Sequence, residues 1–187
     1  MDKDVKKWLK EKSELFLRSV GIKEGQTVLD FGCNDGNYTI SAARIIGSKY
    51  KIYALDKEEK SLVKTIKRAK LGGLENVVGL ISSNELEIPL NGSSIDVILL
   101  YDVLHRGYFP EQKSRYEILK EVYRVLKPDG FISVYPTHLK KYGMTFKRVV
   151  NEIQNVGFNL EGKFYKNLVH DEKLVRGYIF NFRKRKL

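Results

Sequence analysis

The first residues that could do chemistry form a glycine-containing turn behind a short apolar run. Residues 28–36 read VLDFGCNDG, in which Gly32 and Gly36 allow a sharp turn that can approach a ligand. Asn34 replaces the middle glycine of a dinucleotide fingerprint, although asparagine tolerates the left-handed conformation. The Asp30 carboxylate would repel a pyrophosphate and attract a cation. The pattern therefore disfavours NAD and predicts a cationic ligand, with a plain strand-to-helix connection as the alternative.

A second candidate is the acid that closes the next apolar run. Asp56 lies 20 residues after Gly36, and a carboxylate at this place can accept hydrogen bonds from both hydroxyls of a ribose. The alternative is a cap for the following helix. A third apolar run is followed by residues 84–89, NELEIP, where the Asn84 amide could pair with the edge of a purine.

Residues 101–109, YDVLHRGYF, gather polar and aromatic groups behind the most apolar run of the chain. His105 is the best candidate for a general base, and Asp102 could orient a ligand or accept a proton. The alternatives are a pocket-lining or helix-capping histidine and a turn-capping acid. His138 and His170 receive no role. Four aromatic residues are candidates for pocket walls, or for ordinary packing at the sheet edge: Tyr101, Tyr108, Phe109 and Tyr135.

The hydrophobic pattern predicts the elements that must position these side chains. Apolar runs predict strands at 27–31, 51–55, 77–81, 95–101 and 131–135. Helical spacing predicts an opening helix ended by Gly21, and further helices before Gly47, before Gly72, across 118–126 and before Gly157. Segments 160–168 and 173–182 predict a hairpin joined by residues 170–172. We therefore expect an α/β fold, with a doubly wound, mostly parallel sheet, a closing antiparallel hairpin and helices on both faces. In such sheets, ligands bind outside the carboxyl ends of the strands.

Taken together in this order, these pieces resemble the class I S-adenosylmethionine-dependent methyltransferases, and most of all the branch of ubiquinone and menaquinone C-methyltransferases. The resemblance covers roughly residues 25–135 and depends on VLDFGCNDG, Asp56, residues 84–89 and the LKPDGF motif at 126–131. It implies a Rossmann-like sheet of about seven strands. Asp30 fits this cofactor because S-adenosylmethionine carries a sulfonium and an ammonium.

The resemblance also implies where the cofactor and the acceptor would lie. The first motif would wrap the methionine part, Asp56 would hold the ribose, and residue 84 would meet the adenine amine. The chain departs from the family at Asn34 and Asn84, which replace a glycine and an aspartate. His105 and Asp102 are the expected catalytic residues. The residues expected to bind the cofactor are Asp30, Phe31, Gly32, Cys33, Asn34, Gly36, Asp56, Lys57, Asn84, Glu85 and Tyr101.

Composition limits the classes of protein that the chain can belong to. The chain has 187 residues, 42% hydrophobic and 30% charged, from which we expect one domain. The resemblance implies that this is a single methyltransferase domain, with an amino-terminal helix (1–22), a cofactor core (25–135) and a basic helix plus hairpin (136–187). The single cysteine, Cys33, excludes multi-cysteine zinc and iron–sulfur sites, and no metal site is expected. A reducing cytoplasm fits this composition, and no run is long and apolar enough to cross a membrane.

The sequence is compatible with three functions. The preferred reading is methyl transfer from S-adenosylmethionine to a small molecule, with S-adenosylhomocysteine as product. The net charge of +11 supports an RNA or protein methyltransferase as an alternative. The Asn34 and Asn84 departures support a non-catalytic cofactor-binding or interaction protein. The basic run 183–186 is expected to be a solvated, frayed terminus with weak, non-specific affinity for nucleic acid.

Overall fold

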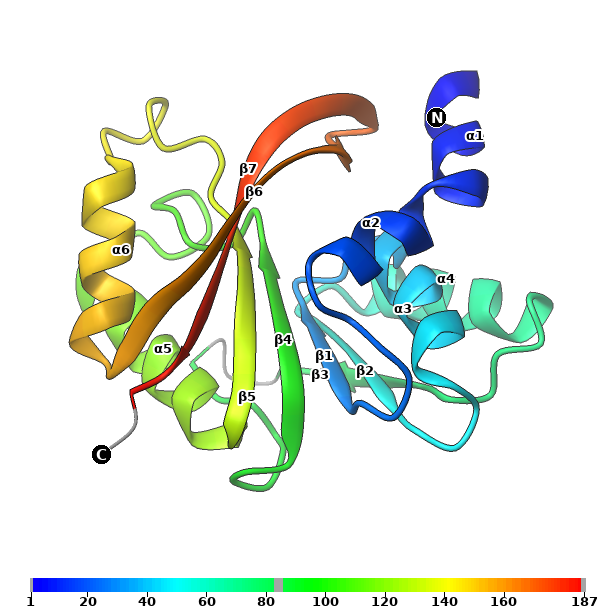
Figure 1. Ribbon diagram of the computed structural model, residues 1–187, viewed down its shortest axis with the longest axis horizontal. Coiled ribbons are helices and arrows are strands. Elements are labelled where there is room, and N and C mark those ends of the chain that lie inside the picture. The colour runs from blue at the N-terminus through cyan, green and yellow to red at the C-terminus, as the bar shows by residue number, and fades with distance from the viewer. Residues whose placement is uncertain (1, 83–85, 186–187) are drawn as a thin grey trace.

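A computed structural model describes residues 2–82 and 86–185 and shows a seven-stranded sheet (Figure 1). The strand order is β3-β2-β1-β4-β5-β7-β6; β1 to β5 run parallel, whereas β7 pairs antiparallel with both β5 and β6. The strands are β1 (Val28–Phe31), β2 (Ile52–Asp56), β3 (Val77–Ile81), β4 (Ile95–Tyr101), β5 (Leu126–Tyr135), β6 (Phe158–His170) and β7 (Lys173–Lys184). The predicted fold class, with its closing antiparallel hairpin, is confirmed.

Helices cover both faces of the sheet. The described helices are α1 (Lys3–Glu11), α2 (Ser13–Ser19), α3 (Asn37–Ile46), α4 (Glu59–Leu71), α5 (Gln112–Val125) and α6 (Phe146–Asn155). Helices α1 to α4 lie on one face and α5 and α6 on the other, as Figure 1 shows. Within the described residues, no helix is both long and apolar enough to cross a membrane.

Alternate residues of the central strands face two separate cores. On β1, Val28 packs among the residues of α1 to α3, whereas its neighbour Leu29 packs among those of α5 and α6, and both are fully buried. Strand β4 divides in the same way, with Val97 in one core and Ile98 in the other. Both faces of these strands are apolar because helices exclude water from both. This explains the continuous apolar runs from which the strands were predicted.

Two predicted boundaries are wrong. The opening helix is interrupted at Lys12, so that α1 and α2 replace one long helix. Strand β5 begins at Leu126 rather than Phe131, because Leu126 pairs with Ile95 across an irregularity in the register of the two strands. Pro128 lacks the N–H that a regular ladder would use, and its place in this irregular stretch makes that loss tolerable.

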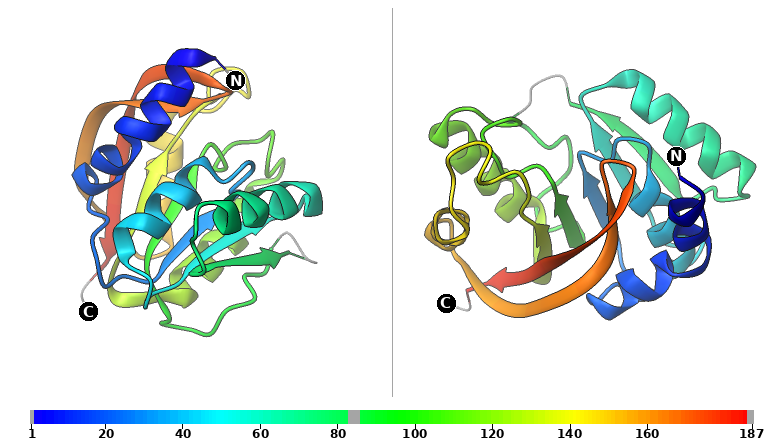
Figure 2. Two further views of the ribbon diagram at one scale, coloured as in Figure 1. Left: turned by 90° about the vertical axis from the view of Figure 1, so that its right-hand side faces the viewer. Right: turned by 90° about the horizontal axis from the view of Figure 1, so that it is seen from above.

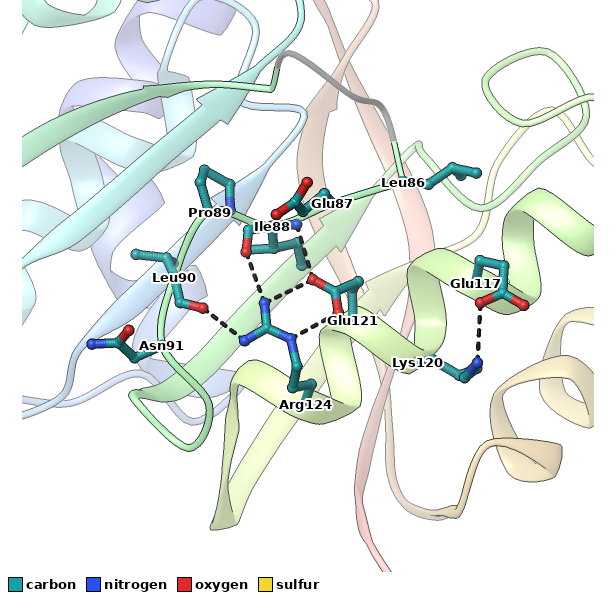
Figure 3. A pocket seen from close by; sticks show the side chains of 10 residues that line it. All are labelled: Leu86, Glu87, Ile88, Pro89, Leu90, Asn91, Glu117, Lys120, Glu121 and Arg124. Carbon is teal, nitrogen blue, oxygen red and sulfur yellow. Dashed lines mark hydrogen bonds and ion pairs between the residues drawn. The ribbon is translucent and has the colours of Figure 1, made fainter.

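The loop between β3 and β4 is fastened to α5 by one arginine. The Arg124 guanidinium donates to the carbonyl oxygens of Ile88 (2.9 Å) and Leu90 (2.8 Å), and Glu121 accepts from the Ile88 N–H (3.2 Å; Figure 3). A hollow of about 570 Å³ lies at this junction. It is lined by charged side chains of α5, and none of its lining residues belongs to the turn after β1.

The basic carboxy-terminal run is not a frayed tail over its described part, which corrects the expectation from sequence. Arg183 and Lys184 belong to β7 and pair with residues of β6. The Arg183 guanidinium also contacts the Glu161 carboxylate (2.6 Å), and the Arg185 N–H donates to the Gly157 carbonyl (2.7 Å). The charged groups of this segment also have partners in β5: the Lys184 ammonium donates to the Leu126 carbonyl, and the Arg183 guanidinium lies over the Phe131 ring, 5.4 Å from its centroid.

Candidate functional site

The turn after β1 has the backbone conformation that its sequence predicts. Gly32, Asn34 and Gly36 all have positive φ angles, of 74°, 45° and 71°. A Cβ on Gly32 would lie 2.6 Å from a side-chain carbon of Val103, and one on Gly36 would lie 2.4 Å from Thr65. Both positions therefore require glycine for conformation and for space. Asn34 adopts the left-handed conformation that this residue type tolerates, so it can replace a glycine here.

Asp56 connects this turn to the end of β2. Its Oδ2 accepts the Asn34 N–H (2.8 Å), and its Oδ1 accepts the Glu58 N–H (3.0 Å) just before α4. The N-cap of α4 is Glu58, so Asp56 accepts an N–H that precedes the helix and does not cap α4 itself. Ribose binding stays a prediction that this geometry permits, since each carboxylate oxygen can accept a second hydrogen bond. The side chain is buried and lines the cavity described below.

Asp30 is the most buried acid of the site. Its carboxylate accepts a hydrogen bond from the Thr39 hydroxyl (2.6 Å). Burial raises the pKa of Asp30 to about 6, and the neighbouring charge of Asp56 adds to this rise, while the Thr39 hydrogen bond opposes it. A cation placed beside this carboxylate would relieve the cost of its ionisation.

A cavity of about 600 Å³ lies at the carboxyl ends of β1, β2 and β4. Its lining includes seven acids and, besides histidines, one basic residue, Lys57, although the chain carries a net charge of +11. The acids are Asp30, Asp35, Asp56, Glu58, Asp102, Asp171 and Glu172. This local reversal of charge fits a cationic ligand such as S-adenosylmethionine and opposes a pyrophosphate.

Tyrosine rings form one wall of the cavity. Tyr101 packs edge-on against Tyr38 (5.1 Å between ring centroids) and against Tyr135 (6.3 Å). Its hydroxyl pairs with that of Ser133 at 3.0 Å, and burial raises its pKa far above the ordinary value. Tyr108 also lines the cavity, whereas Phe109 is buried in the core against Phe31. Ordinary packing is thus the role of Phe109, and the other three predicted aromatic residues reach the cavity.

His105 and Asp102 lie together, but the histidine is already engaged at both ring nitrogens. Its Nδ1 accepts the N–H groups of Gly107 (3.0 Å) and Tyr108 (3.2 Å). Nε2 must then carry the proton, which points to the Asp102 carbonyl (3.0 Å) and to Asp102 Oδ1 (3.3 Å). His105 can therefore take a proton from a methyl acceptor only after its Nδ1 loses the hydrogen bonds from the Gly107 and Tyr108 N–H groups. The arrangement favours a loop-organising histidine.

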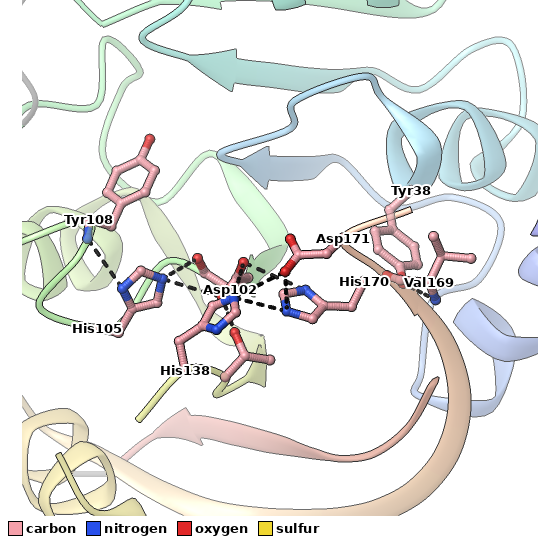
Figure 4. A network of polar contacts seen from close by, with 9 residues as sticks. Tyr38, Asp102, His105, Tyr108, His138, Val169, His170 and Asp171 are labelled. Atoms are coloured by element: carbon pink, nitrogen blue, oxygen red, sulfur yellow. Dashed lines mark hydrogen bonds and ion pairs between the residues drawn. The ribbon is translucent and has the colours of Figure 1, made fainter. Parts of the chain in front are cut away.

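Two histidines that the sequence did not single out lie beside Asp102. His138 follows β5 and His170 ends β6, and their Nε2 atoms are 3.1 Å apart (Figure 4). Asp102 Oδ2 lies 3.6 Å from His138 Nε2 and from His170 Nδ1. These residues are far apart in the chain, so only the strand order could have indicated this cluster.

The remaining predicted residues have different positions. Cys33 and Lys57 line the cavity, and burial raises the pKa of the Cys33 thiol far above its usual range. The Phe31 side chain packs in the core, and Gly36 caps the start of α3. Asn84 and Glu85, expected near the adenine, lie outside the described residues.

Comparisons with known proteins agree with this geometry. A family model described as a methyltransferase domain matches residues 22–172. The demethylmenaquinone methyltransferase of Lactobacillus johnsonii is 28% identical over 83% of this chain and 64% of that protein. That of Geobacillus stearothermophilus is 32% identical over 66% and 49%. The chain therefore spans from about half to just under two thirds of the length of these two relatives.

A third relative and one solved structure complete the comparison. A probable cobalt-precorrin-6B C(15)-methyltransferase of Saccharolobus solfataricus is 29% identical over 86% of this chain and 75% of that protein. The crystal structure of an S-adenosylmethionine-dependent methyltransferase from Aquifex aeolicus has the same fold, with a TM-score of 0.72 at 24% identity over 97% of both chains. The match to the family model, over most of the chain, shows that this protein belongs to the class I S-adenosylmethionine-dependent methyltransferases.

Proposed function

We propose that this protein transfers the methyl group of S-adenosylmethionine to a small-molecule acceptor. The observation that carries the proposal is the acidic cavity at the carboxyl ends of β1, β2 and β4 in a strongly basic chain. When bound, the cofactor supplies a methyl group that is already activated on a sulfonium, so most of the catalysis is positioning. The residues of this chain then have to bind the cofactor and the acceptor, orient them toward each other and exclude water from between them.

The polar residues of the turn would divide this work between them. The Asp30 carboxylate faces the cavity and would stabilise positive charge there. Asp56 would accept the ribose hydroxyls on the lone pairs that the Asn34 and Glu58 N–H groups leave available. Asp102 would accept a proton, where the acceptor holds one, at Oδ2, and His105 would orient this carboxylate through Oδ1.

The surroundings of the cavity favour a small acceptor with an apolar part. A neighbouring hollow of about 610 Å³ shares Tyr135, His138 and His170 with the cavity. Aromatic and aliphatic side chains contribute much of its lining, among them Leu139, Phe146, Tyr178 and Phe180. Relatives named for demethylmenaquinone agree with such an acceptor. At the basic carboxy-terminal edge, Arg183 is already paired with Glu161, which weakens the RNA alternative.

Calorimetry followed by a transfer assay tests the proposal. We expect S-adenosylmethionine and S-adenosylhomocysteine to bind and NAD not to bind. Label from methyl-labelled cofactor should then pass to a small-molecule extract that contains reduced quinones, and not to RNA or protein. Failure to bind the cofactor contradicts the whole proposal, label in RNA or protein contradicts the small acceptor, and binding without any transfer supports a non-catalytic binding protein.

A further inference from the structure

Four side chains that can bind a metal ion meet at the acceptor end of the cavity. Asp102 follows β4, His138 follows β5, and His170 and Asp171 lie at the turn of the β6–β7 hairpin. One ligand atom from each lies within 4.8 Å of the others. Figure 4 shows the two imidazole rings and both carboxylates directed toward a common point. Three separate segments of the chain thus supply one cluster of nitrogen and oxygen donors.

The distances within the cluster match one face of a coordination polyhedron. His138 Nε2, His170 Nε2 and Asp171 Oδ2 are separated by 3.1, 3.4 and 3.5 Å. Ligand atoms about 2.0 Å from a metal are about 3.3 Å apart in a tetrahedron and somewhat closer in an octahedron. Without an ion, two imidazole nitrogens at 3.1 Å are compatible only if one of them carries a proton. An ion would replace that proton and hold both lone pairs.

Asp102 is placed to orient a metal-bound histidine. Its Oδ1 accepts the Thr137 hydroxyl and faces His105 Nε2, so the carboxylate is held in one orientation. The other oxygen, Oδ2, lies 3.6 Å from His170 Nδ1, the ring nitrogen that is not a proposed ligand, and 3.6 Å from His138 Nε2, which is one. A carboxylate beside the second nitrogen of a ligating histidine is the usual outer shell of a metal site.

The backbone holds three of these residues in an unfavourable conformation. Asp102, His138 and Asp171 have φ angles of 60°, 53° and 47°, in the left-handed region that residues other than glycine rarely adopt. Such conformations persist where the surrounding structure fixes them, and they gather at functional sites. At Asp171 the two-residue turn between β6 and β7 accounts for this conformation, since Glu172 shares it with a φ of 57°. Asp102 and His138 have no such turn, so their conformation agrees with a site whose side-chain directions matter.

We propose that His138, His170 and Asp171 bind a divalent first-row transition-metal ion, with Asp102 as the positioning residue. Two imidazoles and a carboxylate suit Zn²⁺, Fe²⁺, Mn²⁺ or Co²⁺ better than Ca²⁺ or Mg²⁺, which prefer oxygen. Because all three residues line the cavity, water or an oxygen atom of the acceptor would fill the remaining coordination positions. Only this last assignment rests on the proposed function.

The test uses untagged, metal-free protein titrated with Co²⁺ alone and with Zn²⁺ alone. We expect one ion per chain in each titration. The Co²⁺-loaded protein should show a visible absorption spectrum, which is lost when Zn²⁺ is then added and displaces Co²⁺. His170→Ala and Asp171→Ala should each weaken binding at least tenfold. The matched control is Glu172→Ala, since Glu172 is the next acid of the same turn, also has a positive φ and lines the same cavity but is outside the cluster.

Each result supports or overturns the site. Circular dichroism establishes that every variant is folded. No Co²⁺ spectrum in the wild type, or equal loss in Asp171→Ala and Glu172→Ala, overturns the proposal. S-adenosylmethionine binding is measured separately on the metal-free protein, so loss of the proposed methyl transfer and loss of the metal site are distinguishable.

Discussion

At the scale of single residues, two aspartates at neighbouring strand ends have different properties because their surroundings differ. Asp30 is enclosed and accepts one hydroxyl, whereas Asp56 accepts two backbone N–H groups. Burial without a compensating cation raises the pKa of Asp30 to about 6, from 3.8 in an unfolded chain. The folded state therefore binds a proton more tightly at this position than the unfolded state does.

This difference makes stability depend on pH in a defined direction. An acid whose pKa is raised by folding contributes stability that is fully present below its unfolded pKa of 3.8. This stability is lost as the pH rises through its folded pKa of about 6. Compared with Asp30→Asn, the wild type should lose about 2 kcal/mol of unfolding free energy between pH 4 and pH 7. Urea unfolding at both pH values measures this. Thr39→Val, which removes the opposing hydrogen bond, should move the loss to higher pH, and a difference independent of pH would contradict the assignment.

Asp56 should matter for the cofactor more than for stability. Asp56→Ala is expected to weaken S-adenosylmethionine binding by about 1.5–3 kcal/mol, because a charged acceptor for the ribose hydroxyls is lost. Asp96→Ala is the matched control, since Asp96 also accepts a backbone N–H, from Thr27 (2.8 Å), but lies at the start of β4. Calorimetry compares the two. Equal affinities in folded Asp56→Ala and wild type would remove the ribose assignment.

The residues of the turn could be predicted from sequence because their chemistry is local. A positive φ at Gly32 and Asn34 follows from residue type, and the acid at Asp56 follows from spacing. The partners of His105 and the cluster around His138 could not be predicted in this way. They depend on which strand ends meet, and on N–H groups two and three residues away whose directions only the folded loop determines.

At the scale of elements, one buried arginine joins α5 to α6. The Arg115 guanidinium has no exposed surface and donates to both oxygens of Glu152 (2.8 and 2.9 Å) and to the Phe109 carbonyl (2.8 Å). Burial alone would raise the pKa of Glu152, but hydrogen bonds from Arg115 and Arg148 outweigh it and lower the pKa. The pair fixes how the two helices of one face lie against each other.

Breaking this buried pair should be costly. Arg115→Ala is expected to lower the unfolding free energy by about 3–5 kcal/mol, because it leaves the Glu152 carboxylate buried without its main partner. Arg148→Ala, which removes a half-buried partner of the same carboxylate, should cost less than about 1 kcal/mol. Denaturant unfolding of the two variants checks this. Similar losses in both would show that the buried contact has no special weight.

At the scale of the whole molecule, charge is distributed unevenly. The chain is strongly basic, yet the charged groups that line the cavity at the carboxyl ends of β1, β2 and β4 are mainly acids. The net charge of the chain and the charge of the cavity therefore have opposite signs: the net charge favours anions, whereas the acids of the cavity suit the proposed cationic cofactor. The net charge indicated the first property from sequence alone. The second required the fold, because the seven acids come from the ends of several strands and from the hairpin.

Salt should separate these two properties. RNA binding, where it occurs, is expected to weaken by orders of magnitude as salt rises from about 50 to 200 mM, because contacts with phosphates release counterions. S-adenosylmethionine affinity, measured in the same buffers, should change far less, because Asp30 and Asp56 are buried and salt screens buried charges much less than exposed ones. Tight, sequence-selective RNA binding at the higher salt concentration would instead favour an RNA methyltransferase.

The position of β7 between β5 and β6 has a consequence for how the protein is made. In Figure 2, the hairpin reaches from the sheet edge towards the amino-terminal helices, and Asn181 Nδ2 donates to the Val20 carbonyl (2.7 Å) across 161 residues. About 40 residues separate the end of β5 from the start of β7, so a ribosome adding 5–20 residues per second needs roughly two to eight seconds to supply the partner strand. Throughout that interval, the nascent chain has an unpaired β5 edge. Chaperone binding to ribosome-bound chains should therefore be strongest between the chain lengths at which β5 and then β7 emerge from the ribosome.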